Sequence, residues 1–143
     1  MLLSHIMTTR LVTVTMDDRL TVVKEIFDKA SIHHVLVVDG EVLTGVISDR
    51  DLLKAISYNV TSKQATAKDL ATLNKRAHHI MTRNVITLTA NATIFDAVST
   101  FNRHTISCIP IIDRHCHPIG IVSWRDIMKA LEKLRKSKQA PAV

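Results

Sequence analysis

The strongest constraint on the fold of this chain is an internal repeat. The string His-Ile-Met-Thr at residues 5–8 recurs 74 positions later, at residues 79–82. One extra residue in the second copy then raises the offset to 75, as from Gly45 to Gly120. Self-similarity at a fixed period is the signature of a duplicated structural unit. The chain therefore consists of two copies of one unit. The matched pairs are Thr13 and Thr87, Thr15 and Thr89, Phe27 and Phe101, Ile32 and Ile106, Asp39 and Asp113, Gly45 and Gly120, Ser48 and Ser123, Arg50 and Arg125, and Asp51 and Asp126.

Each copy predicts the order strand, helix, strand, tight turn, strand, helix. Apolar residues alternate with Thr over residues 11–15 and 85–89, as in short strands. Helical apolar spacing follows in each copy, with Asp17 or Asp18 as the cap of the first helix, and with Asn91 or Thr93 as the cap of the second. The other strands are expected over residues 35–38 and 45–48, and over 109–112 and 120–123; a closing helix follows near 49–51 and 124–126.

These patterns predict an α+β fold of two repeats. About 50 residues bury too little apolar surface alone, so the copies are expected to pack sheet to sheet about a pseudo-twofold axis. The predicted boundaries are 1–57 for the first repeat, 58–78 for a partly helical connection, 79–136 for the second repeat and 137–143 for a flexible C-terminal tail.

Composition limits the broad class of protein. The 143 residues are 46% hydrophobic, which is enough for a core, and no apolar run approaches the ~18 residues of a membrane span. The first residues lack the features of a secretory signal, and two cysteines cannot form a disulfide framework. The sequence therefore predicts a cytoplasmic protein without membrane insertion.

The formal net charge of +6 is concentrated in residues 129–138, which hold five basic side chains and one acid. This stretch suggests an anionic partner, but it has no interleaved aromatic residues for nucleic-acid binding. Cations at the end of a final helix also complement the helix dipole. Nucleic acid is therefore not expected as a partner.

The chain resembles the cystathionine β-synthase-type (CBS) domain pair over nearly its whole length. The resemblance is carried by the Ile-Met-Thr that opens each copy, by the apolar strand ending in Asp39 or Asp113, and by Gly-φ-φ-Ser-x-Arg-Asp (φ apolar) at residues 45–51 and 120–126. It implies a disc-like pair with two clefts between the repeats. In that family the clefts often bind adenine nucleotides, the modules commonly dimerise, and members are generally regulatory.

The same resemblance points to ligand-binding residues in both copies. Ser48 and Asp51, with Ser123 and Asp126, match the family positions that contact ribose and phosphate. The same spacing also describes a helix N-terminal capping device, so both interpretations stay open.

The residues beside these motifs have two interpretations as well. Arg50 and Arg125 could clamp a phosphate, or they could be solvated arginines of a first helical turn. Trp124 replaces Asp49 of the first copy, so the two clefts are not equivalent; it could stack on a base, although a dimer interface is favoured.

An adenine ring would need an apolar slot, and most residues of that kind are core. The candidates by position are Val12, Thr13, Val35, Ile86, Thr87, Ile109 and Pro110.

Metal binding and catalysis have little support. Adjacent side chains such as His33 and His34, or His78 and His79, point in different directions on a strand, and residues 115–117 (His-Cys-His) are expected in a hairpin turn. There is no Cys-x-x-Cys, His-Glu-x-x-His, nucleophile elbow, Walker loop or dinucleotide fingerprint. The sequence predicts no enzyme, no metal and no required cofactor.

The leading hypothesis is a regulatory module that senses an adenosine-containing ligand such as AMP, ADP or ATP, or a related compound such as S-adenosylmethionine. A homodimer would then signal to an unknown effector protein. The alternative is a scaffold or dimerisation protein with degenerate clefts, and the negative charge of Asp49 near the first phosphate site fits this alternative.

Overall fold

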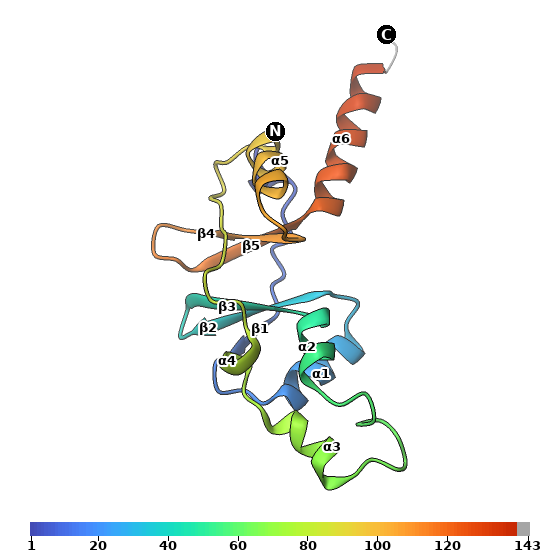
Figure 1. Ribbon diagram of the computed structural model, residues 1–143. Helices are drawn as coiled ribbons and strands as arrows, with labels where there is room; N and C mark the ends of the chain where they lie inside the picture. Colours follow the sequence, from blue (N-terminus) through green and yellow to red (C-terminus); the bar gives the residue numbers. More distant parts are fainter. Residues whose placement is uncertain (140–143) are drawn as a thin grey trace. The chain divides into compact units, whose positions relative to one another are not determined.

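The computed structural model describes residues 1–139, which form two compact units (Figure 1). One unit comprises residues 12–85, and the other combines residues 1–11 with those from 86 onward. The opening segment of each copy thus packs with the body of the other copy. The boundaries of the sequence repeats therefore do not coincide with the boundaries of the compact units.

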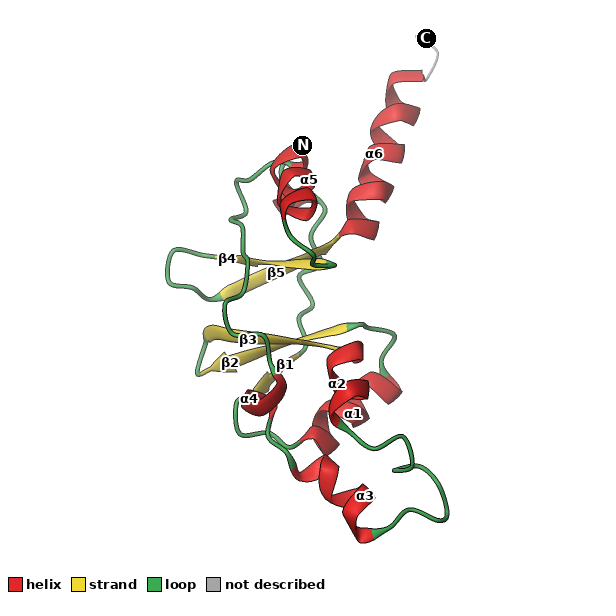
Figure 2. Cartoon of the chain, in the orientation of Figure 1, coloured by secondary structure: helices red, strands yellow, loops and turns green. Residues whose placement is uncertain are grey.

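The unit of residues 12–85 is built on a three-stranded sheet in the order β1-β2-β3, with β1 parallel and β3 antiparallel to β2 (Figure 2). Its elements are β1 (Thr13–Thr15), α1 (Leu20–Lys29), β2 (His34–Asp39), β3 (Val42–Ser48), α2 (Asp49–Ala55), α3 (Ala67–Ala71), the 3-10 helix η2 (Thr72–Asn74) and α4 (Ala77–Ile80). Helices α3 and η2 lie within residues 58–78.

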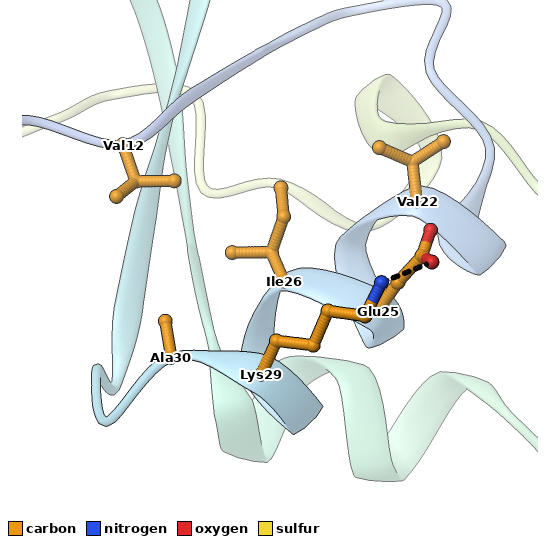
Figure 3. A pocket seen from close by; sticks show the side chains of 6 residues that line it. All are labelled: Val12, Val22, Glu25, Ile26, Lys29 and Ala30. Carbon is orange, nitrogen blue, oxygen red and sulfur yellow. Dashed lines mark hydrogen bonds and ion pairs between the residues drawn. The ribbon is translucent and has the colours of Figure 1, made fainter.

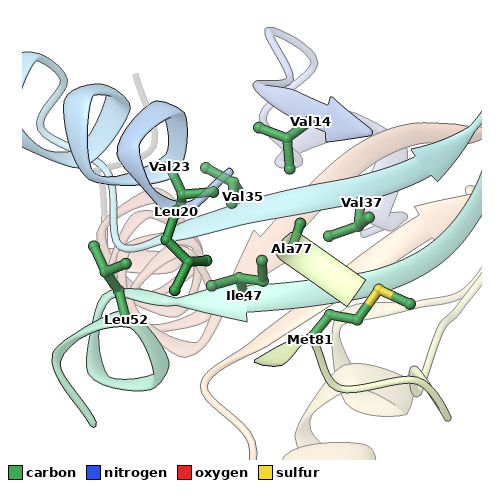
Figure 4. Close-up of a cluster of buried hydrophobic side chains, with 9 residues drawn as sticks. All are labelled: Val14, Leu20, Val23, Val35, Val37, Ile47, Leu52, Ala77 and Met81. Atoms are coloured by element: carbon green, nitrogen blue, oxygen red, sulfur yellow. The ribbon is translucent and has the colours of Figure 1, made fainter. Parts of the chain in front are cut away.

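The core of this unit lies between the sheet and its helices (Figure 4). Leu20 and Val23 come from one face of α1, at the helical spacing that the sequence indicates. Val35 and Val37 of β2 are fully buried, and Leu36 between them keeps only 2% of its surface exposed. Burial of three consecutive residues means that both faces of this strand are covered.

The second unit has an antiparallel two-stranded sheet. Its elements are the 3-10 helix η1 (Leu3–His5), α5 (Ile94–Arg103), β4 (Cys108–Ile112), β5 (Pro118–Ser123) and α6 (Trp124–Gln139). Its core includes Leu3, Ile94, Ile109 and Val122. Residues 137–139, which the sequence predicts as part of a flexible tail, belong to α6, because this helix continues to Gln139. Residues 140–143 of that predicted tail lie outside the described residues.

The strand predicted over residues 85–89 is wrong in extent, since only Leu88 pairs, in a parallel bridge with Ile111. The cause is Pro110. In the other unit the Leu36 N–H donates to the carbonyl of Val12 at 3.1 Å, whereas the matching Pro110 has no N–H to donate. Strand pairing in the first unit starts at Thr13, whose counterpart is Thr87. In the second unit it starts one residue later, at Leu88. The strand predicted over residues 11–15 is also shorter, at Thr13–Thr15.

Of the helices α1 and α5, for which the sequence predicts caps, only α5 has a predicted cap. Thr93 caps α5, where the Asp96 N–H donates to Thr93 Oγ1 at 3.2 Å and the Thr93 N–H donates to Asp96 Oδ2 at 2.7 Å. Neither Asp17 nor Asp18 caps α1, because its N-cap is Arg19. Asp18 instead accepts a hydrogen bond from the Thr15 N–H at 2.8 Å, as carboxylates do in turns.

Each Ile-Met-Thr segment adds to the edge of a sheet. Thr82 exchanges two backbone hydrogen bonds with Val46, at 2.9 and 3.1 Å, and Thr8 does the same with Ile121, at 2.9 and 3.0 Å. The adjacent methionine then lies over a glycine: a Cβ atom at Gly45 would sit 2.5 Å from Met81 Sδ, and Gly120 faces Met7 in the same way. The motif glycines are therefore explained by space, because methionine fills the position of a side chain.

Candidate functional site

Ser48 and Asp51 form a capping box at the start of α2. The Asp51 N–H donates to Ser48 Oγ at 3.1 Å, and the Ser48 N–H donates to Asp51 Oδ2 at 2.9 Å. Both residues are half-buried. The capping interpretation is therefore confirmed. It leaves Oδ1 of Asp51 as an acceptor for a ligand, since the cap uses Oδ2.

Ser123 and Asp126 form the same box at the start of α6. The Ser123 N–H and hydroxyl both donate to Asp126 Oδ2, at 2.8 and 3.0 Å, and the Asp126 N–H donates to Ser123 Oγ at 3.2 Å. Two reciprocal boxes at matching positions hold the serine and aspartate of each motif in one geometry. Such a fixed pair suits a binding site, because little side-chain entropy remains to be lost on binding.

An open hollow lies beside α1 in the unit of residues 12–85 (Figure 3). Its apolar part is made by Val12, Val22, Ile26 and Ala30. At its edge the ammonium of Lys29 pairs with the Glu25 carboxylate at 2.8 Å. An apolar surface with a charged edge suits one face of a planar base.

A second hollow adjoins the first and shares Lys29 and Ala30 with it. It is lined by residues 27–33 and by Asp49, which is the first residue of α2. The two hollows together lead from Val12 to the helix start that carries Ser48 and Asp51. The loop between α1 and β2 is the part of this surface that sequence reasoning did not single out.

The first residue of each closing helix is hydrogen-bonded to the residue just before the first strand of the hairpin, β2 in the first repeat and β4 in the second. The Asp49 N–H donates to the carbonyl of His33 at 2.9 Å, and the Trp124 N–H donates to that of Ser107 at 3.4 Å. In the first repeat the side chains pair as well, with 3.0 Å between His33 Nδ1 and Asp49 Oδ2. This hydrogen bond lowers the pKa of the Asp49 carboxyl. Asp49 is therefore a carboxylate at neutral pH.

The structure separates the predicted apolar-slot residues into three groups. Val35 and Ile109 are 0% exposed and belong to the cores, and Pro110 is also fully buried, so these three present no surface to a ligand. Val12 lines the first hollow. Thr13 is exposed on β1, and Ile86 and Thr87 are half-buried ahead of Leu88.

Arg50 and Arg125 are exposed in the first turns of α2 and α6. Trp124, beside Arg125, keeps 52% of its surface exposed. Both guanidinium groups are thus accessible to an anionic partner. Their role as phosphate clamps stays a prediction.

Histidine rings approach one another in pairs. His78 and His79 lie on helix α4, and not on a strand as expected, with ring centroids 4.1 Å apart; the rings of His115 and His117 are 5.7 Å apart. Residues 115–117 lie in the turn between β4 and β5, as predicted, where the N–H groups of His115 and His117 donate to Asp113 Oδ1 at 2.8 and 3.0 Å. Cys116 adopts a positive φ of 61° in this turn. Among residues 1–139, no three His, Cys, Asp or Glu side chains are grouped as metal ligands.

The two cysteines are expected to differ sharply in reactivity. Cys108 is buried, which raises the pKa of its thiol to about 12, whereas Cys116 is exposed. Because the thiolate is the reactive form, one thiol per native chain should react readily with Ellman's reagent, and two should react in denaturant. A Cys116→Ser variant should abolish the native reaction. Fast native reaction of that variant would contradict the buried environment of Cys108.

Comparison with known proteins identifies the family. The family model of the CBS domain matches residues 3–58 and 77–133. The chain belongs to the CBS domain family. The mixed α+β fold of two CBS repeats, predicted from the sequence, is confirmed.

Solved CBS domain pairs resemble the chain over most of its length. The CBS domain pair of protein MJ0100, in complex with 5′-methylthioadenosine and S-adenosyl-L-methionine, is 26% identical, with a TM-score of 0.77 over 94% of this chain and 98% of that chain. CBSX2 from Arabidopsis thaliana, in complex with AMP, is 22% identical, with a TM-score of 0.78 over 94% of this chain and 98% of that one. At that identity the likeness to CBSX2 shows the fold alone.

Curated relatives include longer proteins. Protein MJ1225 of Methanocaldococcus jannaschii is 30% identical over 93 residues, which are 62% of this chain and 33% of the relative. A homoserine O-acetyltransferase of Methanococcoides burtonii is 27% identical over 111 residues, which are 78% of this chain and 20% of the enzyme. The chain thus spans a third or less of these relatives, one of which is named as an enzyme.

Proposed function

We propose that this CBS pair is a non-catalytic regulatory module that binds an adenosine-containing ligand. The observation that carries the proposal is the match to the MJ0100 pair, which holds two adenosine compounds and is covered almost completely by this chain. The fixed Ser48–Asp51 and Ser123–Asp126 pairs are the groups proposed to contact ribose. The apolar hollow beside Val12 is proposed to receive the base.

The ligand is proposed to act by shifting a conformational population. A ligand changes an equilibrium only by its difference in affinity for the two states. We propose that a homodimer passes this change to an effector protein. Exposed apolar side chains support a protein contact: Leu53 and Met128 occupy matching positions of α2 and α6 and are 71% and 59% exposed.

The location of the protein is proposed as cytoplasmic, which agrees with two free cysteines. Within residues 1–139, no helix has the length and apolar character required to cross a membrane.

A thermal-shift panel tests the proposed ligand class. AMP, ADP, ATP, 5′-methylthioadenosine and S-adenosylmethionine would each be added to the wild type and to the Asp51→Ala and Asp126→Ala variants. A ligand at about 100 times its Kd adds about 2.7 kcal/mol of stability, so at least one compound should raise the Tm by several degrees. One of the two variants should lose that ligand-induced rise.

Asp96→Ala is the matched control for this panel. Asp96 forms an equivalent capping box in α5, but it lies outside the Gly-φ-φ-Ser-x-Arg-Asp motif. Each of the three substitutions removes the carboxylate of a capping box and should lower the Tm without ligand by a similar amount, corresponding to about 1 kcal/mol. Asp96→Ala should keep the full ligand response, which one of the two motif variants loses. If no compound shifts the wild type, the scaffold function with degenerate sites is favoured instead.

A further inference from the structure

The two repeats differ in charge and polarity around the proposed site. In the first repeat the hollow beside α1 is lined by Val22, Ile26 and Ala30. At an offset of 74 the second repeat has Asp96, Thr100 and His104 at these positions. The apolar surface suited to a base therefore belongs to the first repeat.

The first repeat also has a carboxylate where the second has none. Asp49 lines the hollow, and its side chain is 43% exposed. Its counterpart is Trp124, whose N–H makes the matching backbone hydrogen bond to Ser107, the residue just before β4. The two positions are thus equivalent in the fold, and only their side chains differ.

The charge of Asp49 is the least compensated in this hollow. Glu25 is paired with the ammonium of Lys29, and Asp28 with that of Lys24. Asp49 interacts with the imidazole of His33, which is 79% exposed, and with that of His34, and an imidazole carries charge only when it is protonated. Arg50 contributes one positive charge beside it, but Arg125 does the same in the second repeat. At the first position of the closing helix, the difference between the repeats is therefore one carboxylate, Asp49, in place of Trp124.

We propose that the site of the first repeat selects an adenosine compound without phosphate, either neutral or cationic, and that Asp49 is the residue that discriminates against phosphate. The inference rests on the proposed adenosine-binding function. A carboxylate beside the ribose site repels a phosphate on the 5′ carbon, whereas it tolerates a thioether and attracts a sulfonium. The second repeat has no carboxylate at this position and lacks this discrimination.

Isothermal titration with 5′-methylthioadenosine and with AMP tests the inference in the wild type and in Asp49→Asn. The wild type should bind 5′-methylthioadenosine more tightly than AMP. Removing one negative charge near a phosphate should tighten AMP binding roughly five- to tenfold at low salt, with a smaller gain at high salt. Affinity for 5′-methylthioadenosine should change by about twofold or less, because an uncharged ligand has little Coulomb interaction with Asp49.

Asp39→Asn is the matched control, because it removes the same charge at the other end of β2. It should leave both affinities unchanged. If both compounds bind but Asp49→Asn does not change their ratio, Asp49 does not discriminate and the inference fails alone. If neither compound binds the wild type, and the thermal-shift panel is also negative, the proposed function fails together with the inference.

Discussion

Replacing Gly120 with valine is expected to lower the free energy of unfolding by about 1–3 kcal/mol. The physical reason is the side chain of Met7, whose sulfur and Cγ occupy the space that a Cβ atom would need. To avoid this clash, the segment that holds Met7 and Thr8 would have to move away from β5. That movement would weaken the two hydrogen bonds between Thr8 and Ile121. The measurement is equilibrium denaturation by urea, followed by circular dichroism.

A double-mutant cycle isolates this contact. Met7→Ala alone removes buried surface, and Gly120→Val alone creates a clash, but in the double variant valine can occupy the space left by methionine. The two losses should therefore not add, and the double variant should be more stable than their sum implies by about 1 kcal/mol. Gly45 with Met81 offers the same cycle in the other unit. Strict additivity in both cycles would show that methionine does not restrict these glycines.

The sequence predicts the elements of this protein well because each has a periodic or local cause. Alternation with threonine, helical apolar spacing and the Ser-x-x-Asp boxes depend on neighbours in the chain. The strand over residues 85–89 was predicted too long because its hydrogen-bond partner lies elsewhere. Pro110 lacks the donor that Leu36 supplies, and a comparison of these two matched positions would have revealed the loss.

The packing of the opening segments could not be predicted in the same way. Two strands of the same Gly-φ-φ-Ser pattern, β3 and β5, can each accept an Ile-Met-Thr segment, and local spacing does not distinguish them. The structure pairs Thr8 with Ile121 of β5, and Thr82 with Val46 of β3. The choice depends on the reach of the chain and on long-range packing, neither of which a repeat pattern records.

The candidate site was predicted in part. The positions of the serines and aspartates follow from the motif, and their capping geometry follows from their spacing. The apolar residues were harder to assign, since β2 is buried over three consecutive residues and shows no alternation there. In such a sequence, a valine that belongs to the core cannot be told from a valine that would contact the adenine ring. The hollow itself has a signal, because Val22 and Ile26 are apolar where the second copy has Asp96 and Thr100.

Truncating Ile109 to alanine is expected to cost about 2–5 kcal/mol of stability and to leave adenosine binding unchanged. Ile109 is 0% exposed within the core of its unit, so the truncation leaves a cavity that the close-packed surroundings fill only partly. Urea denaturation measures the loss, and titration with 5′-methylthioadenosine, at a temperature where the variant is folded, measures the affinity.

Val12→Ala should show the opposite pattern. Val12 is half-buried and lines the hollow beside α1, so its truncation leaves no closed cavity and should cost less stability than Ile109→Ala. It also removes apolar surface from the proposed base site, and two methyl groups in contact with a ligand correspond to roughly 1 kcal/mol, or a five- to tenfold loss of affinity. Weaker binding by Ile109→Ala with unchanged affinity in Val12→Ala would reverse this assignment. The base would then contact residues that are now in the core, and binding would have to open the second unit.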